Sequence, residues 1–339
     1  MEYRSLGRTG VQVSPLCLGA MNFGMAAGKE DAAAIIDRAL DVGLNFIDTA
    51  NVYTRGVSEE IVGQALAANG KRGRVVLATK VFGTMDENDP NARWATRRHI
   101  IEQCHASLER LGTDYIDLYQ IHRPSPEYPI DETLRALDDL VRDGKVRYIG
   151  TSTFAAWQIL ESLWSSKEYG LNRFVCEQPP YNLLDRQVER EVIPMAQAYG
   201  IGIIPWSPLA SGRLTGKYQR GQDAPEDSRF QRVIRDTKKE LDEFFSPQIW
   251  DLIEGVEALA GGKGVPVSQF ALAWLLAQPG VSSAIIGPRT LEHLEDNLAA
   301  LEVEITDEDR EKIDELIPPG AYARDYYAGT EFSPSKYRW

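Results

Sequence analysis

The 339-residue sequence is poor in residues that cross-link a chain or carry it through a membrane. Its only cysteines, Cys17, Cys104 and Cys176, are odd in number and form no Cys-x-x-Cys pair. We therefore expect buried thiols and no disulfides, as in a reducing compartment. No apolar run approaches the roughly 20 residues of a membrane-spanning helix, and residues 1–10 lack the apolar core of a signal peptide. The sequence thus predicts a soluble protein of the cytoplasm.

Histidine and net positive charge are also scarce. The histidines stand only at positions 99, 105, 122 and 293, without a His-x-x-x-His pair or a cysteine cluster, so we predict no metal site. The formal net charge of −13 argues against nucleic acid as a partner, because proteins that bind a phosphate backbone concentrate positive charge. An acidic protein that binds an anionic ligand must gather Lys and Arg locally, which makes cations beside glycine turns informative.

Short apolar runs alternate with helical patterns along the chain. One such pattern places Ala32, Ile35, Ile36 and Ala39 on a single helical face. Strands that alternate with amphipathic helices are typical of a parallel sheet covered by helices. The predicted strands are residues 16–19, 44–48, 75–80, 115–122, 146–150, 174–178, 202–206 and 283–286. Eight such units predict an α/β fold, a (β/α)8 TIM barrel, and the length suits one barrel domain over residues 1–339.

Three segments interrupt this alternation. Residues 3–13 predict a β-hairpin around Gly7 and Gly10. Residues 207–247 form an irregular insertion whose heavily charged part, 219–245, we expect to be either mobile or partly helical and to act as a lid. The C-terminal tail, residues 317–339, is rich in aromatic residues, which predicts that it packs on the barrel, lines a pocket or meets another subunit.

Two helix starts carry a local signal. Ser58 and Thr306 are each followed by acidic residues. A serine or threonine cap and acidic residues in the first turn both stabilise the amino end of a helix. We therefore predict capped helices that begin at these two positions.

Four polar side chains, Asp48, Tyr53, Lys80 and His122, stand at or just behind the ends of three predicted strands. In a parallel barrel those ends face one rim, so the four side chains would converge. An ammonium group favours the phenolate form of a nearby tyrosine, and a carboxylate would hold that ammonium in place. A neutral His122 would donate a hydrogen bond to a carbonyl oxygen that gains negative charge. Such a proton-donor site lacks a source of electrons, which implies a nicotinamide cofactor.

Other interpretations exist for these residues. Each of the four alone is typical of a solvated rim residue or of a structural histidine. Lys80 alone would also suit a barrel that forms a Schiff base, as the covalent nucleophile of an aldolase. That interpretation leaves the motifs further along the chain without a role.

Those motifs give the chain a resemblance to the aldo-keto reductase family over roughly residues 3–316. They read Asp48-Thr-Ala-Asn-Val-Tyr53, Ala-Thr-Lys80, Gln-Ile-His122, Gly150-Thr-Ser-Thr-Phe154, Glu-Gln178-Pro-Pro-Tyr181-Asn182, Trp206-Ser207-Pro-Leu209 and Gly287-Pro-Arg289. The resemblance implies a TIM barrel that binds NADPH without a Rossmann fold, with the hairpin closing the bottom of the barrel. It also implies that Tyr53 is the general acid, supported by Asp48, Lys80 and His122.

The resemblance further implies where the cofactor would lie. Ser152 and Gln178 would hold the nicotinamide amide, and Trp206 would stack on the nicotinamide ring. The family more often has Asn at the position of Thr153, and Gln and Glu at those of His293 and Asp296. The full set of predicted cofactor-binding residues is Gly19, Met21, Asp48, Ser152, Thr153, Gln178, Trp206, Ser207, Leu209, Gly212, Lys217, Gly287, Arg289, His293, Asp296 and Asn297.

Three basic residues suit the phosphates of NADPH. Arg289 stands just before a predicted helix of residues 291–301, where bidentate pairing and the helix dipole favour the 2′-phosphate of adenosine. Arg213 and Lys217, among the glycines of the insertion, would clasp the pyrophosphate, although a basic loop without a ligand would look alike. The implied activity is reduction of an aldehyde or ketone with NADPH. The alternative is a nicotinamide-binding regulatory subunit similar to the β subunits of potassium channels.

Overall fold

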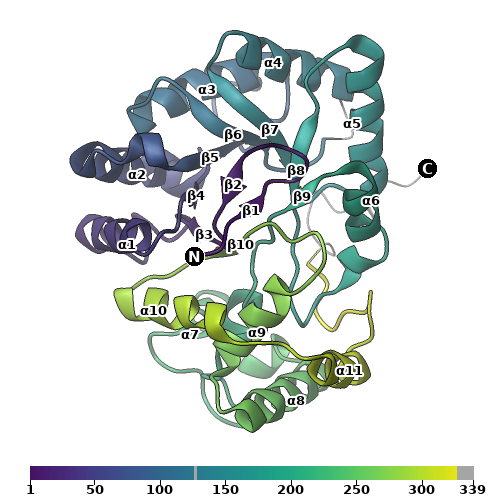
Figure 1. Ribbon diagram of the computed structural model, residues 1–339. Coiled ribbons are helices and arrows are strands. Elements are labelled where there is room, and N and C mark those ends of the chain that lie inside the picture. The colour runs from purple at the N-terminus through teal and green to yellow at the C-terminus, as the bar shows by residue number, and fades with distance from the viewer. Residues whose placement is uncertain (126–127, 327–339) are drawn as a thin grey trace.

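Eight parallel strands form a barrel in the computed structural model, which describes residues 1–125 and 128–326 (Figure 1). They are β3 (Leu16–Gly19), β4 (Phe46–Asp48), β5 (Val76–Val81), β6 (Ile116–Ile121), β7 (Val146–Ser152), β8 (Phe174–Gln178), β9 (Gly202–Ile203) and β10 (Ala284–Ile286). They pair in the order β10-β3-β4-β5-β6-β7-β8-β9. The Ile203 amide donates to the Gly280 carbonyl (3.1 Å) and the Ile285 amide to the Pro205 carbonyl (2.9 Å), which joins the two ends of the sheet. The predicted barrel and its strands are therefore confirmed.

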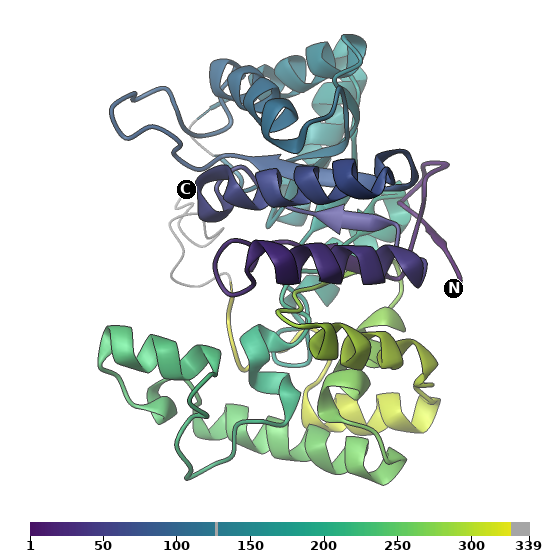
Figure 2. The same ribbon diagram turned by 90° about the vertical axis from the view of Figure 1, so that its left-hand side faces the viewer.

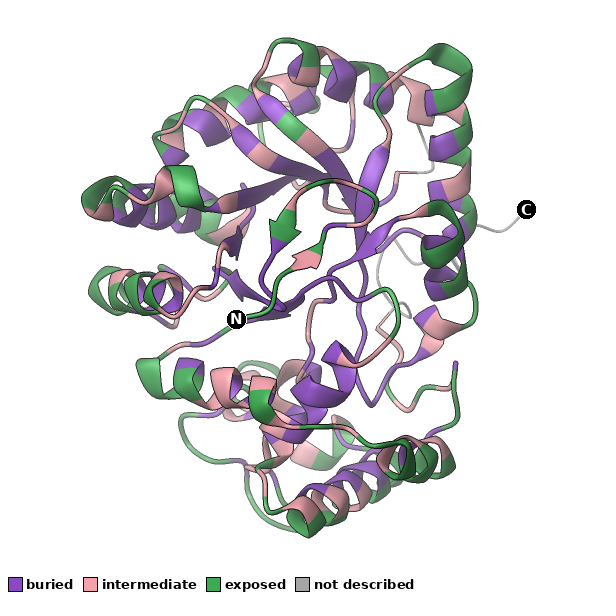
Figure 3. Ribbon diagram, in the orientation of Figure 1, coloured by how far each residue is buried: buried purple, intermediate pink, exposed green. Residues whose placement is uncertain are grey.

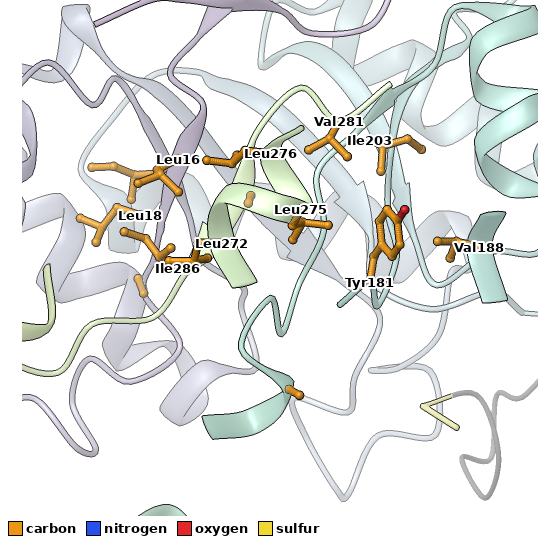
Figure 4. Packing of buried hydrophobic residues seen from close by; sticks show 14 of the residues in the cluster. Leu16, Leu18, Tyr181, Val188, Ile203, Leu272, Leu275, Leu276, Val281 and Ile286 are labelled. Atoms are coloured by element: carbon orange, nitrogen blue, oxygen red, sulfur yellow. The ribbon is translucent and has the colours of Figure 1, made fainter. Parts of the chain in front are cut away.

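Helices surround the strands and turn their apolar faces inward (Figure 3). The connecting helices are α1 (Lys29–Asp41), α2 (Val57–Asn69), α3 (Arg97–Leu111), α4 (Ile130–Arg142), α5 (Ala156–Tyr169), α6 (Val192–Tyr199), α8 (Pro247–Lys263), α9 (Val267–Leu276) and α10 (Leu291–Ala299), followed by α11 (Asp307–Leu316). The leucines of α9 pack against Leu16 and Ile286 of the barrel wall (Figure 4). Among the described residues, no helix combines the length and the apolar character needed to cross a lipid bilayer.

The predicted N-terminal hairpin covers one end of the barrel. Its strands β1 (Arg4–Ser5) and β2 (Gln12–Val13) are antiparallel and lie at the right of Figure 2. Leu6 and Val13 of the hairpin join an apolar cluster with inward residues of the strands, among them the free thiols of Cys17 and Cys176. Gly7, at φ +56°, leaves no room for a side chain, since a Cβ would lie 2.5 Å from the Val175 carbonyl oxygen. This end of the barrel is therefore closed by the hairpin.

The two predicted helix caps have different outcomes. The Thr306 hydroxyl accepts a hydrogen bond from the Asp309 amide (3.2 Å), and the Asp309 carboxylate accepts one from the Thr306 amide (2.8 Å). This cap is therefore confirmed. The prediction for Ser58 was wrong, because α2 already begins at Val57 after Gly56 in the left-handed region. The Ser58 hydroxyl is buried and donates to the Ala20 carbonyl (2.8 Å). A tertiary contact thus uses the side chain that the local pattern assigned to the helix end.

The insertion of residues 207–247 contains helical turns, as predicted. They are η4 (Ala210–Thr215), α7 (Arg229–Thr237) and η5 (Leu241–Glu243). An aromatic cluster of Tyr218, Phe230, Phe245 and Trp250 ties the insertion to α8. Residues 317–326 of the tail pack on the loop after β8, which confirms one of the expectations for it; Tyr327, Phe332, Tyr337 and Trp339 lie outside the described residues.

Candidate functional site

Polar side chains replace apolar ones inside the barrel as the strands approach their carboxyl ends. Side chains of a strand alternate between its two faces, so every second residue points inward. The inward positions change from Phe46 to Asp48, from Ala78 to Lys80, from Leu118 to Gln120 and from Cys176 to Gln178. The first residue of each pair belongs to the apolar cluster next to the hairpin. The second residues, nearer the carboxyl ends, are hydrogen-bonded to one another. The barrel register thus builds a buried polar group at its open end.

Lys80 lies at the centre of this group. Its Nζ donates to Asp48 Oδ1 (2.5 Å), to the Thr49 carbonyl (2.8 Å) and to the Tyr53 hydroxyl (3.2 Å). The side chain is fully buried, and burial works to lower the pKa of Lys80. Asp48 and Tyr53 outweigh that effect and raise the pKa above its ordinary value, so Lys80 stays an ammonium ion.

Two glutamines fix the carboxylate of Asp48. Gln120 Nε2 and Gln178 Nε2 both donate to Asp48 Oδ2 at 3.0 Å, and Gln178 also donates to Gln120 Oε1 (3.1 Å). Gln120 was missed by the sequence reasoning, although its inward position two residues before His122 carried the signal. Gly150 beside it has no side chain, and a Cβ there would meet Cys176 Sγ at 2.6 Å. Glycine at this position makes the room that Gln120 and Cys176 occupy.

Tyr53 and His122 face each other across the rim. Tyr53 begins a short helical turn, η1 (Tyr53–Gly56), in which Thr54 and Arg55 have positive φ angles of 50° and 52°. The two rings are perpendicular at a centroid distance of 5.7 Å. Burial, together with the charges of Lys80 and Arg123, lowers the pKa of His122 well below its ordinary value. His122 is therefore neutral at physiological pH, as predicted, and offers one N–H donor.

The turn after β7 holds the next group of predicted residues. Ser152 donates to the Gln178 carbonyl (2.9 Å), and Thr153 accepts a hydrogen bond from Arg123 (2.8 Å). Thr153 has φ +63°, a strained angle for a β-branched residue that costs on the order of 1–3 kcal/mol. Asparagine tolerates this angle better than threonine does. The strain lies where the family resemblance assigns the nicotinamide amide.

Glu177 supports this turn from inside and was missed in the sequence. The side chain is fully buried, and its carboxylate accepts hydrogen bonds from the Thr151 hydroxyl (2.5 Å) and the Phe154 amide (3.1 Å). Burial raises the pKa of Glu177 to about 8, against the lowering effect of these bonds. Only the pairing of β7 with β8 reveals this contact.

The loop after Trp206 is strained over several residues. Ser207, Ala210 and Ser211 have positive φ angles of 53°, 49° and 60°. The Nε1 of Trp206 is buried without a hydrogen-bond partner among the described residues. Strain and unpaired polar atoms persist where the surrounding structure or a ligand compensates for them.

Arg213 of this loop is buried rather than open to a ligand. Its guanidinium lies 4.3 Å from the Phe230 ring centroid and 4.9 Å from that of Phe245, and it donates to the Ala210 and Phe244 carbonyls. Burial lowers the pKa of Arg213 to about 10. The expectation that Arg213 clasps a pyrophosphate therefore needs correction, because this side chain braces the insertion.

Four basic side chains gather where α7, the insertion and α10 meet. Burial and the charges of Arg289 and Arg232 lower the pKa of Lys217. Burial and the charges of Arg289 and Lys217 lower the pKa of His293, against the acidic side chains of its own helix. Arg232 of α7 was missed in the sequence because its place in the cluster depends on how the insertion folds. This basic cluster (Lys217, Arg232, Arg289 and His293) suits an anionic group.

The remaining predicted cofactor residues lie around this rim in different environments. Gly19 is packed so closely that a Cβ would lie 2.6 Å from Ile285 Cγ2, Met21 is 42% exposed, and the Gly287 carbonyl accepts a bond from Asn22. Leu209 is half-buried, Gly212 takes φ +96° in the loop, and Asn297 is buried on α10. Asp296 already accepts hydrogen bonds from Ser268 (2.7 Å) and Gln269 (2.8 Å) on α9.

Residues 15–318 match the model of the aldo/keto reductase family. The chain belongs to this family. It is 39% identical to an uncharacterized oxidoreductase of Bacillus subtilis, over 97% of this chain and 100% of the relative. It is equally 39% identical to a probable voltage-gated potassium channel subunit beta of Oryza sativa, over 89% and 92% of the two chains. Identity to the versiconal hemiacetal acetate reductase of Aspergillus parasiticus is 36%, over 95% and 98%.

This aldo/keto reductase carries, at the open end of its barrel, the four polar side chains that the sequence predicted there. Asp48, Tyr53, Lys80 and His122 converge, and the first three are joined by hydrogen bonds. Family membership supports a nicotinamide-type oxidoreductase.

Proposed function

We propose that this aldo/keto reductase reduces an aldehyde or ketone to the alcohol with NADPH, with Tyr53 as the general acid. The observation that carries the proposal is the hydrogen-bonded chain from Asp48 through Lys80 to Tyr53, beside a neutral His122. We expect a small carbonyl compound as substrate and a cytoplasmic location. The reverse oxidation would use the same groups.

Each residue of the chain has a separate task. The Asp48 carboxylate holds the Lys80 ammonium in place, and both glutamines keep that carboxylate oriented. The ammonium stabilises the phenolate that Tyr53 becomes when it gives its proton to the carbonyl oxygen. The N–H of His122 orients the same oxygen and stabilises its developing charge. When bound, the reduced nicotinamide supplies the hydride to the carbonyl carbon.

The residues at this end of the barrel fit NADPH. Ser152, Thr153 and Gln178 lie together beside Asp48, where they would hold the carboxamide of the nicotinamide. The unpaired Nε1 of Trp206 and the strained loop that follows offer donors to a ligand. The basic cluster would hold the 2′-phosphate that distinguishes NADPH from NADH. Gly19, Met21, Leu209 and Gly287 would line the path between the two.

The direct test is the substitution Tyr53→Phe. Loss of the hydroxyl removes the general acid, and we expect turnover of simple aldehydes to fall by about 10² to 10⁴. Fluorescence titration with NADPH should give an unchanged dissociation constant, because Lys80 and Asp48 remain. Turnover equal to that of the wild type would refute the role of Tyr53.

A second candidate function rests on the relatives that are named as potassium channel β subunits. Such a subunit would bind NADPH tightly and serve mainly as a sensor. The two candidates differ in turnover, since an enzyme oxidises NADPH with some member of a broad carbonyl panel. The hydrogen-bonded Asp48, Lys80 and Tyr53 favour the enzyme.

A further inference from the structure

Arg123 follows His122 just beyond β6, and its half-buried side chain reaches the turn after β7. Its Nη1 donates to the His122 carbonyl (2.9 Å) and to the Thr153 hydroxyl oxygen (2.8 Å). The guanidinium carbon lies 5.7 Å from the centroid of the Trp206 ring. Arg123 thus connects three residues that the proposed function places around the nicotinamide.

The side chains of Ser152 and Gln178 have already used their hydrogen-bond donors. Gln178 Nε2 carries two hydrogens, and it donates to Asp48 Oδ2 (3.0 Å) and to Gln120 Oε1 (3.1 Å). The Ser152 hydroxyl donates its one hydrogen to the Gln178 carbonyl (2.9 Å). What these two side chains retain for a ligand is therefore acceptor atoms, Ser152 Oγ and Gln178 Oε1.

A carboxamide needs partners of both kinds. Its NH2 group donates two hydrogen bonds, and its carbonyl oxygen accepts them. Ser152 Oγ and Gln178 Oε1 suit the NH2 group, but neither can donate to the oxygen. A carbonyl oxygen that leaves water without gaining a donor weakens binding. The donor for this oxygen must come from another side chain.

Thr153 has the hydrogen that this oxygen needs. Because its oxygen accepts from the Arg123 guanidinium, its own hydrogen must point in another direction. Among the described residues, the acceptor that this hydrogen meets is Ser152 Oγ at 3.4 Å, which is long for a bond between two hydroxyls. A hydroxyl that accepts from a cation also becomes a better donor, because the bonds polarise one another.

We propose that Arg123 is a positioning residue for the cofactor: it holds the Thr153 hydroxyl so that its hydrogen is donated to the carboxamide oxygen of the nicotinamide. Ser152 and Gln178 accept from the NH2 group of the same carboxamide. The inference deepens the proposed function and rests on it, since that function brings the carboxamide here. The motifs that carry the family resemblance do not include Arg123.

The arginine matters because the residue at position 153 is a threonine. Asparagine, which the family more often has there, would bring N–H donors of its own. Threonine brings a single hydrogen on a hydroxyl that can rotate, and the direction of that hydrogen depends on what the oxygen accepts. Arg123 and Thr153 together thus replace what one asparagine would supply.

The test is a calorimetric titration with three ligands. They are NADPH, its thionicotinamide analogue, in which sulfur replaces the carboxamide oxygen, and 2′-phospho-ADP-ribose, which has no nicotinamide. In Arg123→Met and in Thr153→Val we expect the dissociation constant of NADPH to rise about fivefold. The other two ligands should stay within about twofold, because sulfur is a weak acceptor and the ribose compound lacks the group. Valine keeps the branched shape of threonine.

The double variant Arg123→Met with Thr153→Val tests whether the arginine acts through the threonine. We expect its affinity for NADPH to be no lower than that of either single variant. Arg123→Lys keeps an N–H donor and should recover much of the affinity. Ser152→Ala is the contrast, since it removes an acceptor of the NH2 group and should weaken NADPH and the thionicotinamide analogue alike.

Arg147→Met is the matched control, because Arg147 is exposed at the opposite end of β7 and donates to the Gly144 carbonyl. All its dissociation constants should equal those of the wild type. Losses that add in the double variant, an equal loss for all three ligands, or an unchanged affinity for NADPH would overturn the proposal. A wild type that binds NADPH but reduces no carbonyl compound refutes only the proposed function, and a wild type that does not bind NADPH overturns both.

Discussion

Lys80 and Asp48, on neighbouring strands β5 and β4, form a fully buried ion pair of 2.5 Å at the open end of the barrel. Its charges are also satisfied by hydrogen bonds to Thr49, Tyr53, Gln120 and Gln178. A buried pair is costly to desolvate, and its main contribution here is to orient the phenol of Tyr53.

Breaking this pair should cost both stability and activity. In Lys80→Met, Asp48 keeps its two glutamines but loses its counterion, and we expect a loss of about 3–5 kcal/mol in the free energy of unfolding. The double variant Lys80→Met with Asp48→Asn should recover much of that stability and none of the turnover. Urea denaturation and NADPH oxidation measure the two effects. Lys71→Met is the control, since its pair with Asp41 is partly exposed and worth at most about 1 kcal/mol. A double variant as unstable as Lys80→Met would contradict this account.

The reaction should show no imidazole titration. Burial and the charges of Lys80 and Arg123 lower the pKa of His122 well below its ordinary value, so the ring stays neutral as the pH falls through 6.5. We expect kcat/KM for reduction to be without an inflection between about pH 5.5 and 7.5 from this group. An inflection near pH 6.5 that disappears in His122→Asn would count against a neutral ring.

Ionisation of Glu177 should destabilise the protein at alkaline pH. Burial raises the pKa of Glu177 in the folded chain to about 8, from the ordinary 4.5, so the folded state binds this proton more tightly than the unfolded state does. The stability therefore falls as the pH rises from 4.5 through 8, by an amount on the order of several kcal/mol.

Glu177→Gln is the variant that isolates this effect. Glutamine resembles the protonated acid and ionises in neither state, so the variant should already exceed the stability of the wild type near pH 6.5, and by a larger margin near pH 9. Urea denaturation at both values measures the difference, and Asp185, with a pKa of about 6, contributes little over this range. Glu161→Gln, at an exposed position of α5, should keep the wild-type dependence. Parallel pH curves for Glu177→Gln and the wild type would exclude Glu177 as the cause.

Discrimination between NADPH and NADH should depend on the basic cluster. We expect Arg289→Leu to raise the dissociation constant of NADPH about ten- to a hundredfold and to leave that of NADH within about twofold, because only NADPH carries the 2′-phosphate. Arg232→Leu should show a smaller effect in the same direction. Arg235→Leu, an exposed residue of the same helix, is the control. Equal losses for both cofactors would place the 2′-phosphate elsewhere.

Residue periodicity alone was enough to predict the barrel, because each strand and helix carries its own apolar pattern. The convergence of Asp48, Tyr53, Lys80 and His122 followed from one further rule, that parallel strand ends share a rim. Gln120 followed the same alternation and was overlooked. Ser58 shows the limit of local signals, since a backbone carbonyl of another segment uses the hydroxyl that a helix cap would need.

The sequence by itself determined the fold class and the chemical types at the rim, since both depend on spacing along one chain. Only the tertiary structure decided that Arg213 is buried, that Arg232 joins Lys217 and Arg289, and that Tyr326 lies on Trp206. These contacts join segments far apart in the chain. Their geometry depends on strand register and on how the insertion and residues 317–326 of the tail pack. No local pattern encodes such distances, because they are set by the free energy of the whole packed structure.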